Sequence, residues 1–189
     1  KNGAVMSFVR FAAPGEPLYA PRIGVASADA VLGCDVVVTA GREALACMSE
    51  GRTRAVVNVA STPTAAFTRD PDWKFPLGAM ESAIVDATGA DRACFVDASR
   101  LATALLGDAI ASNLFMLGYA WQRGLVPLSA AAIERAIELN EVAIEQNKAA
   151  FAWGRVAALD PARVEAAAEP AGPPPVSHRL SSSLEEIVA

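Results

Sequence analysis

Two short polar segments follow predicted strands and carry residue types that can bind ligands. Gly41 and Arg42 come after the β-branched run 36–38, and Asp97 comes directly after the apolar run 93–96. A glycine at a helix N-terminus can bind an anion, and α/β sheets bind ligands at the carboxyl ends of their strands. Each position also has a structural interpretation: a plain strand–turn–helix connection at Gly41 and a helix cap at Asp97. We favour the structural interpretation at both, and keep all three residues as candidate substrate or interface residues.

Acid–base and nucleophilic chemistry has few candidates. The only histidine, His178, lies in a proline-rich segment without a positioned partner, which predicts no catalytic imidazole and no Ser–His or Cys–His pair. Cys34, Cys47 and Cys94 contain no Cys-x-x-Cys spacing, which predicts neither a zinc site nor an iron–sulfur cluster built from this chain alone. We therefore expect no catalytic residue, no metal site and no cofactor held within this chain.

Two asparagines lie inside long apolar segments that we expect to be helices. Asn is a mediocre helix former, so its place in an Ala/Leu/Phe/Met run suggests a hydrogen-bonding role. We expect Asn113 and Asn147 to be buried amides that join two packed helices. Contact with a ligand is the alternative for Asn113, which is kept as a candidate site residue.

The elements that must position these residues follow from hydrophobic periodicity. Apolar strand-like runs alternate with helical segments in the first half, which predicts a Rossmann-like parallel α/β sheet with flanking helices. The second half is wholly helical in pattern. We expect strands at 5–12, 36–38, 55–59 and 93–96, and helices at 27–32, 42–49, 78–88, 99–106, 110–123 and from the capping residue Ser129 to about 157.

Composition and texture set the domain boundaries and exclude some partners. The chain has 189 residues, a hydrophobic content of 53% and a net charge of −5, which argues for one packed domain and against nucleic acid as the main partner. No run of 18 apolar residues occurs, which predicts no membrane span. We expect a domain at 1–160, a proline-rich linker at 161–180, and the start of a following domain at 181–189.

Several segments together resemble the gamma domain of the 2-oxoacid:ferredoxin oxidoreductases, nearest to the fused bacterial indolepyruvate ferredoxin oxidoreductases. The resemblance covers roughly residues 1–160, and its most specific stretches are 1–10, 33–38, 106–118 and 145–155. Gamma domains of this family usually begin with a strand, a glycine-rich turn and a helix, which this sequence lacks. We therefore expect an internal fragment without its first βα unit.

The resemblance implies a thiamine diphosphate-dependent enzyme that oxidatively decarboxylates an aryl 2-oxoacid such as indolepyruvate to the acyl-CoA. The whole enzyme would use thiamine diphosphate, magnesium, coenzyme A and an iron–sulfur cluster, would reduce ferredoxin, and would be a cytoplasmic homo-oligomer. This chain would pack against other domains or subunits as scaffold and interface, and would help to shape the coenzyme A path. Asn2 and Gly3 would lie near the interface with the thiamine-binding domains. The isolated chain would be inactive.

A second hypothesis belongs to a different class of protein. The chain would be a non-catalytic α/β module that binds a nucleotide or serves only for assembly. Ligand affinity of the isolated chain separates the two hypotheses, because a binding module retains it and a fragment of a larger enzyme does not.

Overall fold

Three parallel strands form the centre of the molecule. The structure is a computed structural model that describes residues 4–60 and 75–169. Its sheet has the order β1-β2-β3, so that β2 is hydrogen-bonded on both sides and β1 is an edge strand. The strands are β1 Ala30–Gly33, β2 Arg54–Asn58 and β3 Ala93–Val96. The Rossmann-like parallel sheet predicted from the sequence is confirmed, as are the strands expected at 55–59 and 93–96.

Three of the expected elements in the first half are wrong. The segment 5–12 forms no strand, and β1 occupies part of the expected helix at 27–32. The β-branched run 36–38 is helical and belongs to α1 (Val36–Thr39). The physical reason is Asp35, whose carboxylate accepts the backbone N–H of Val37 at 2.7 Å and of Val38 at 3.2 Å. Such capping starts a helix even where the side chains favour a strand.

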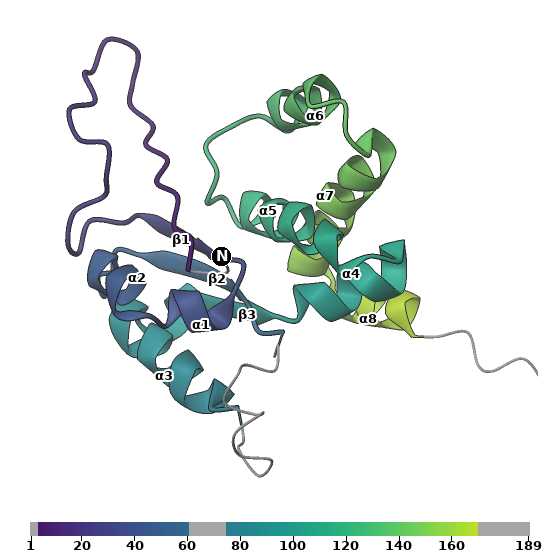
Figure 1. Cartoon of the computed structure of the whole chain (residues 1–189), viewed down its shortest axis with the longest axis horizontal. Coiled ribbons are helices and arrows are strands. Elements are labelled where there is room, and N and C mark those ends of the chain that lie inside the picture. The colour runs from purple at the N-terminus through teal and green to yellow at the C-terminus, as the bar shows by residue number, and fades with distance from the viewer. Residues whose placement is uncertain (1–3, 61–74, 170–189) are drawn as a thin grey trace, which may run out of the picture.

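Helices cover the sheet on both faces (Figure 1). One face carries α1, α2 (Arg42–Cys47) and α3 (Leu77–Thr88), and its core is built around Val36, Val57 and Ile84, each 0% exposed. The other face carries the helical carboxyl-terminal half, with Phe115 and Phe151 as its largest fully buried side chains. The helices of that half are α4 (Ala98–Leu106), α5 (Ser112–Gln122), α6 (Ala130–Leu139), α7 (Ile144–Leu159) and α8 (Pro161–Ala168).

The long helix expected from Ser129 to about 157 is two helices. Glu141 and Ala143 have φ values of 56° and 44°, and this left-handed turn ends α6 and starts α7. The predicted cap is confirmed, because the hydroxyl of Ser129 accepts the N–H of Ala132 at 3.1 Å. The expected helix at 110–123 begins with a short 3₁₀ turn, η2 (Ala109–Ala111), before α5. Among the described helices, none combines the length and the apolar content needed to cross a membrane.

Two glycines bring the backbones of α5 and α7 into direct contact. A Cβ atom at Gly118 would collide with the carbonyl oxygen of Phe151 and lie 2.9 Å from its carbonyl carbon. A Cβ atom at Gly154 would collide with the carbonyl oxygen of Phe115 and lie 2.9 Å from the backbone nitrogen of Tyr119. The absence of a side chain at both positions therefore sets the spacing of the two helices.

The linker was predicted to begin at residue 161, but this residue starts a helix. Residues 161–168 form α8, which Asp160 caps by accepting the N–H of Arg163 at 3.1 Å. Its Val164 is 0% exposed and its Ala168 is 8% exposed, so the helix packs into the core. Pro161 reads as a helix breaker in the sequence, but proline is favoured in the first turn of a helix. The rest of the expected linker, 170–180, and the expected new domain at 181–189 lie outside the described residues.

Candidate functional site

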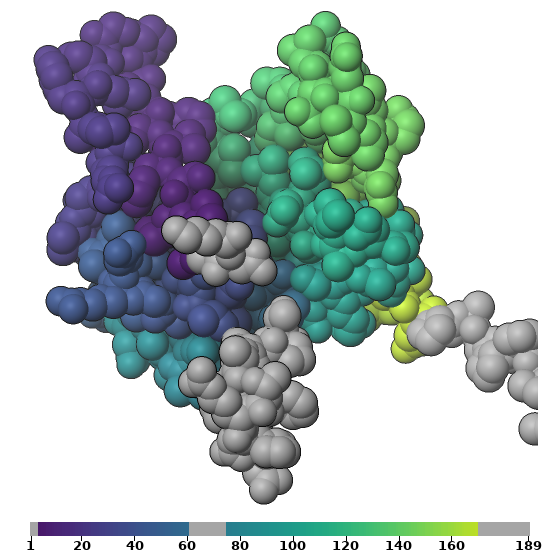
Figure 2. Space-filling model, viewed as in Figure 1, coloured from purple at the N-terminus to yellow at the C-terminus, as the bar shows by residue number. Residues whose placement is uncertain are grey.

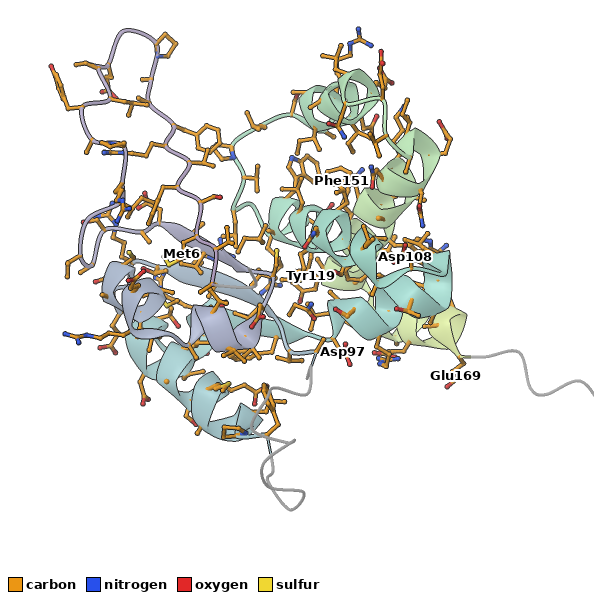
Figure 3. The ribbon with its side chains drawn as sticks, viewed as in Figure 1. Met6, Asp97, Asp108, Tyr119, Phe151 and Glu169 are labelled. Atoms are coloured by element: carbon orange, nitrogen blue, oxygen red, sulfur yellow. The ribbon has the colours of Figure 1, made fainter. Side chains whose placement is uncertain are left out.

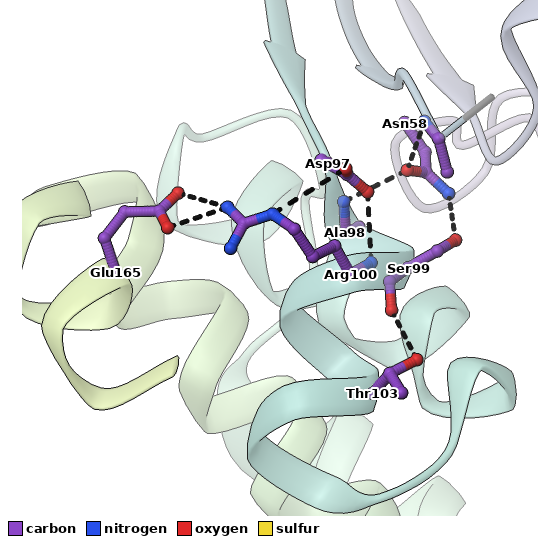
Figure 4. A network of polar contacts seen from close by, with 8 residues as sticks. Asn58, Asp97, Ala98, Ser99, Arg100, Thr103 and Glu165 are labelled. Carbon is purple, nitrogen blue, oxygen red and sulfur yellow. Dashed lines mark hydrogen bonds and ion pairs between the residues drawn. The ribbon is translucent and has the colours of Figure 1, made fainter. Parts of the chain in front are cut away.

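The side-chain amide of Asn58 links the carboxyl ends of the three strands. Asn58, the last residue of β2, is 4% exposed, and its Nδ2 donates to the carbonyl oxygen of Cys34 at 3.2 Å and to the hydroxyl of Ser99 at 2.9 Å. Its Oδ1 accepts the N–H of Ala98 at 3.0 Å and of Ala60 at 3.2 Å (Figure 4). Because Asn58 thereby ties the ends of all three strands, its amide is a structural clamp. The sequence signal for it was a lone amide at the end of a buried apolar run.

Asp97 caps α4, which is the structural role that we favoured for it. Its Oδ1 accepts the backbone N–H of Arg100 at 3.0 Å, and its Oδ2 lies 3.8 Å from Nε of the same residue. The Arg100 guanidinium also binds the Glu165 carboxylate of α8. Its Nη2 donates to Oε1 at 2.6 Å and to Oε2 at 2.7 Å. These charge-assisted hydrogen bonds raise the pKa of Arg100.

Gly41 and Arg42 do not follow a strand, as we expected, but link two helices. Gly41 is the N-cap of α2, and a Cβ atom there would lie 2.9 Å from the carbonyl oxygen of Val38, so a larger residue would strain the turn out of α1. Arg42 is exposed in the first turn of α2. Within 4–60 and 75–169, no hydrogen bond or ion pair joins either residue to Asp97. The structure does not gather these predicted site residues into one cluster.

The two asparagines do not join helices through buried amides. Asn113 is exposed on α5, next to the buried Ser112. Asn147 is half-buried, and its Nδ2 donates to the carbonyl oxygen of Val142 at 2.9 Å, which closes the turn before α7. The close contact between α5 and α7 comes from glycines instead. Asn2 and Gly3 lie outside the described residues, so their predicted interface role stays a prediction.

An apolar groove of about 800 Å³ lies beside β1, which is an edge strand of the described sheet. We call residues 4–23, which project from the sheet as a long loop that doubles back on itself, the arm (Figures 1 and 2). The arm forms one wall of the groove, α1 and α2 contribute another, and α5 with the loop after it forms the third. Met6, labelled in Figure 3, packs where the arm meets the sheet. Side chains that line the groove include Val5, Phe8, Leu32, Val38, Leu117 and Leu128.

The groove leaves apolar side chains in water. Leu32 of β1 is 39% exposed, Leu128 is 44% exposed, and Val5 on the arm is 80% exposed. Cys34 also lines the groove, where desolvation of its thiol, and then the neighbouring Asp35 carboxylate, raise the pKa of that thiol. A thiol with a raised pKa is protonated at neutral pH and is a poor nucleophile and metal ligand. The groove is therefore suited to apolar contacts.

The cysteines do not fit an iron–sulfur cluster, which needs about four thiolate ligands. The chain has three cysteines and one histidine. The cysteines are free and come from separate elements: Cys47 donates to the carbonyl oxygen of Glu43 at 3.4 Å, and Cys94 accepts from Nη2 of Arg123 at 3.5 Å. In the described part of the chain, no three His, Cys, Asp or Glu side chains are grouped so that they could hold a metal ion.

Comparison with known proteins identifies a family over most of the chain. No curated protein and no solved structure matches it. A family model described as pyruvate ferredoxin/flavodoxin oxidoreductase matches residues 1–157, which include the arm, the sheet and the helices up to α7. Because the match covers the parallel sheet, both helical layers and the groove, the chain belongs to the pyruvate ferredoxin/flavodoxin oxidoreductase family.

Proposed function

We propose that this chain is the gamma-type domain of a 2-oxoacid:ferredoxin oxidoreductase that acts on an aryl 2-oxoacid such as indolepyruvate. Family membership makes the chain part of an oxidoreductase that works with ferredoxin, and the family generally uses thiamine diphosphate and iron–sulfur clusters in the whole enzyme. The aryl substrate rests on the resemblance of 106–118 and 145–155 to the indolepyruvate enzymes. Coenzyme A, magnesium, a homo-oligomeric state and a cytoplasmic location are further parts of this proposal.

The open groove beside β1 is the observation that carries the proposed role as scaffold and interface. Strands of parallel sheets are buried on both faces, and β2 conforms, with Val56 at 1% and Val57 at 0% exposure. β1 is not buried in this way, because its Leu32 is 39% exposed beside an apolar groove of about 800 Å³. An exposed apolar surface of this kind marks a contact with another part of a protein. The polar side chains at the carboxyl edge, in contrast, are engaged in capping and in tying the strands.

The proposed occupant of the groove is a strand and helix from another part of the oxidoreductase. An added strand would pair with the free backbone groups of β1, and its helix would cover Leu32. The neighbouring domains of the enzyme would then contact the arm, where Phe11 is 52% exposed and Tyr19 is 88% exposed. Gly41, Arg42, Asp97 and Asn113 remain proposed substrate or interface residues on this assembled surface.

The substrate part of the proposal is tested on the whole oxidoreductase that contains this chain. We would measure coenzyme A-dependent reduction of ferredoxin with indolepyruvate and with pyruvate. The proposal expects kcat/KM for indolepyruvate to exceed that for pyruvate by at least about tenfold, since a pocket that fits the aryl group gains its burial energy. A preference for pyruvate would contradict the aryl assignment and leave the family unchanged.

The interface part is tested with two matched substitutions. Leu32→Asp places a charge in the groove, and Leu159→Asp places one at the end of α7, where Leu159 is 71% exposed. We expect the first variant to lose assembly and activity of the whole enzyme and the second to keep both, because only the groove would be desolvated on assembly. Equal activity of the two variants would remove the groove from the interface. Tight nucleotide binding by the isolated chain would favour the non-catalytic module instead.

A further inference from the structure

Helix α8 lies beyond the residues that match the family, yet it is part of the same core. The family match ends at residue 157, and α8 spans Pro161–Ala168. Val164 is 0% exposed and packs in one cluster with Leu101 of α4 and Ala157 of α7. A helix of eight residues is too short to be stable alone in water, so its order depends on this packing.

A polar chain runs from α8 to the carboxyl edge of the sheet (Figure 4). Glu165 accepts two hydrogen bonds from Arg100, at 2.6 and 2.7 Å. Arg100 lies in the first turn of α4, where Asp97 caps its backbone N–H at 3.0 Å. In the same turn, Ser99 accepts from Asn58 at 2.9 Å. Through the first turn of α4, these three residue pairs therefore connect α8 with the amide that ties the strand ends.

We propose that α8 is a strap through which the chain beyond the family domain holds the first turn of α4, and with it the carboxyl edge of the sheet, in place. Val164 is the anchor, because a fully buried valine contributes far more than a surface ion pair. The side chains of the Arg100–Glu165 pair are 50% and 52% exposed. The pair therefore orients α8 against α4 but contributes little to the stability of their packing.

The strap also determines where the polypeptide leaves the domain. α8 packs against both α4 and α7, and its last residues lie below α4 at Glu169 (Figure 3). A displacement of the chain after Glu169 would be transmitted to α4 by two contacts. These are the packing of Val164 in the core and the ion pair between Glu165 and Arg100. The state of the strap thereby controls the order of the carboxyl edge, whichever substrate the whole enzyme uses.

The experiment is hydrogen exchange, followed by mass spectrometry, on the full chain. Val164→Asp buries a charge and should release α8, so that exchange at 161–168 reaches that of an unstructured segment and exchange at 98–103 rises by about tenfold or more. Glu165→Gln should raise exchange at 98–103 by about two- to fivefold, as expected for a surface ion pair. The control, Arg163→Gln, changes an exposed charge on the same helix and should alter neither segment.

Helix α3, on the opposite face of the sheet, is the internal reference for global unfolding. Free exchange of α8 in Val164→Asp with unchanged protection at 98–103 would overturn the proposal, and so would persistent protection of α8. If the Val164→Asp variant unfolds completely, the milder substitution Val164→Ala is used in its place. In that milder variant, α8 and 98–103 must lose more protection than α3, and an equal loss in all three segments would refute the strap.

Discussion

Substituting Gly154 by alanine tests whether the contact between α5 and α7 organises the helical half. The added methyl group would collide with the carbonyl oxygen of Phe115 and lie 2.8 Å from its carbonyl carbon and 2.9 Å from the backbone nitrogen of Tyr119. These are backbone atoms of α5, so the collision cannot be relieved by a side-chain rotation. The two helices must move apart, which loosens the packing around Phe115 and Phe151, at 0% and 1% exposure.

The expected loss of stability follows from two opposing effects. Overpacking a core costs about 1–3 kcal/mol, and a collision with backbone belongs at the upper end of that range. Alanine is the better helix former by about 1 kcal/mol, which partly offsets the cost. We therefore expect Gly154→Ala to lower the free energy of unfolding by about 2 kcal/mol, and Tm by roughly 4–8 °C for a chain of this size.

The matched control is Gly78→Ala in α3, where a Cβ atom would meet nothing within 4 Å. The same substitution in open space should leave stability unchanged or raise it by up to about 1 kcal/mol. Urea unfolding monitored by far-ultraviolet circular dichroism measures both variants. If Gly154→Ala were as stable as Gly78→Ala, the tight crossing would not exist as described. Gly118→Ala with Gly154→Ala should cost less than the sum of the two, because one separation of the helices relieves both collisions.

Three further predictions concern the clamp, an exposed ion pair and metal content. Asn58→Ala should lower the free energy of unfolding by about 1–3 kcal/mol, because it leaves backbone partners unsatisfied, whereas Asn113→Ala at an exposed site should change it by less than about 0.5 kcal/mol; urea midpoints of both variants measure this. Hydrogen bonds from Lys148 and then from Arg135 lower the pKa of the Glu138 carboxyl below its ordinary value of 4.5. The stability that these bonds give to the folded protein is therefore present above that value and is lost as the pH falls through the pKa of the folded state. An NMR titration should show this depressed pKa, and Lys148→Met should raise it, while an unchanged titration in the variant would contradict the pairing. The purified chain should show no iron–sulfur absorbance, and iron and sulfide bound in stoichiometric amounts would refute the cysteine argument.

Local patterns predicted the elements whose causes are local. The strands at β2 and β3 are short apolar runs, and the sequence identified them because a buried parallel strand needs little else. Ser129 and Asp97 were identified as caps because capping depends on residues only three positions away. The strand expected at 36–38 failed for a reason that is also local: the Asp35 cap outweighs the strand preference of three valines.

Other features of the candidate site depend on residues far apart in the chain. Asn58 bonds to residues 24, 40 and 41 positions away, and Arg100 meets Glu165 across 65 positions. Asn113 was expected to be buried because its neighbours are apolar, but the orientation of α5 against the sheet leaves it exposed.

The sequence by itself determined the α/β class, the family resemblance, the alternation of strands and helices, and the small number of cysteines and histidines. Only the tertiary structure decided which glycines join α5 and α7, that α8 belongs to the core, and that β1 is an edge strand of the described sheet. The physical reason is that periodicity and capping act within one or two helical turns. Close helix crossings and grooves, in contrast, arise when distant segments share a surface, and the fit of that surface is encoded by no single stretch of chain.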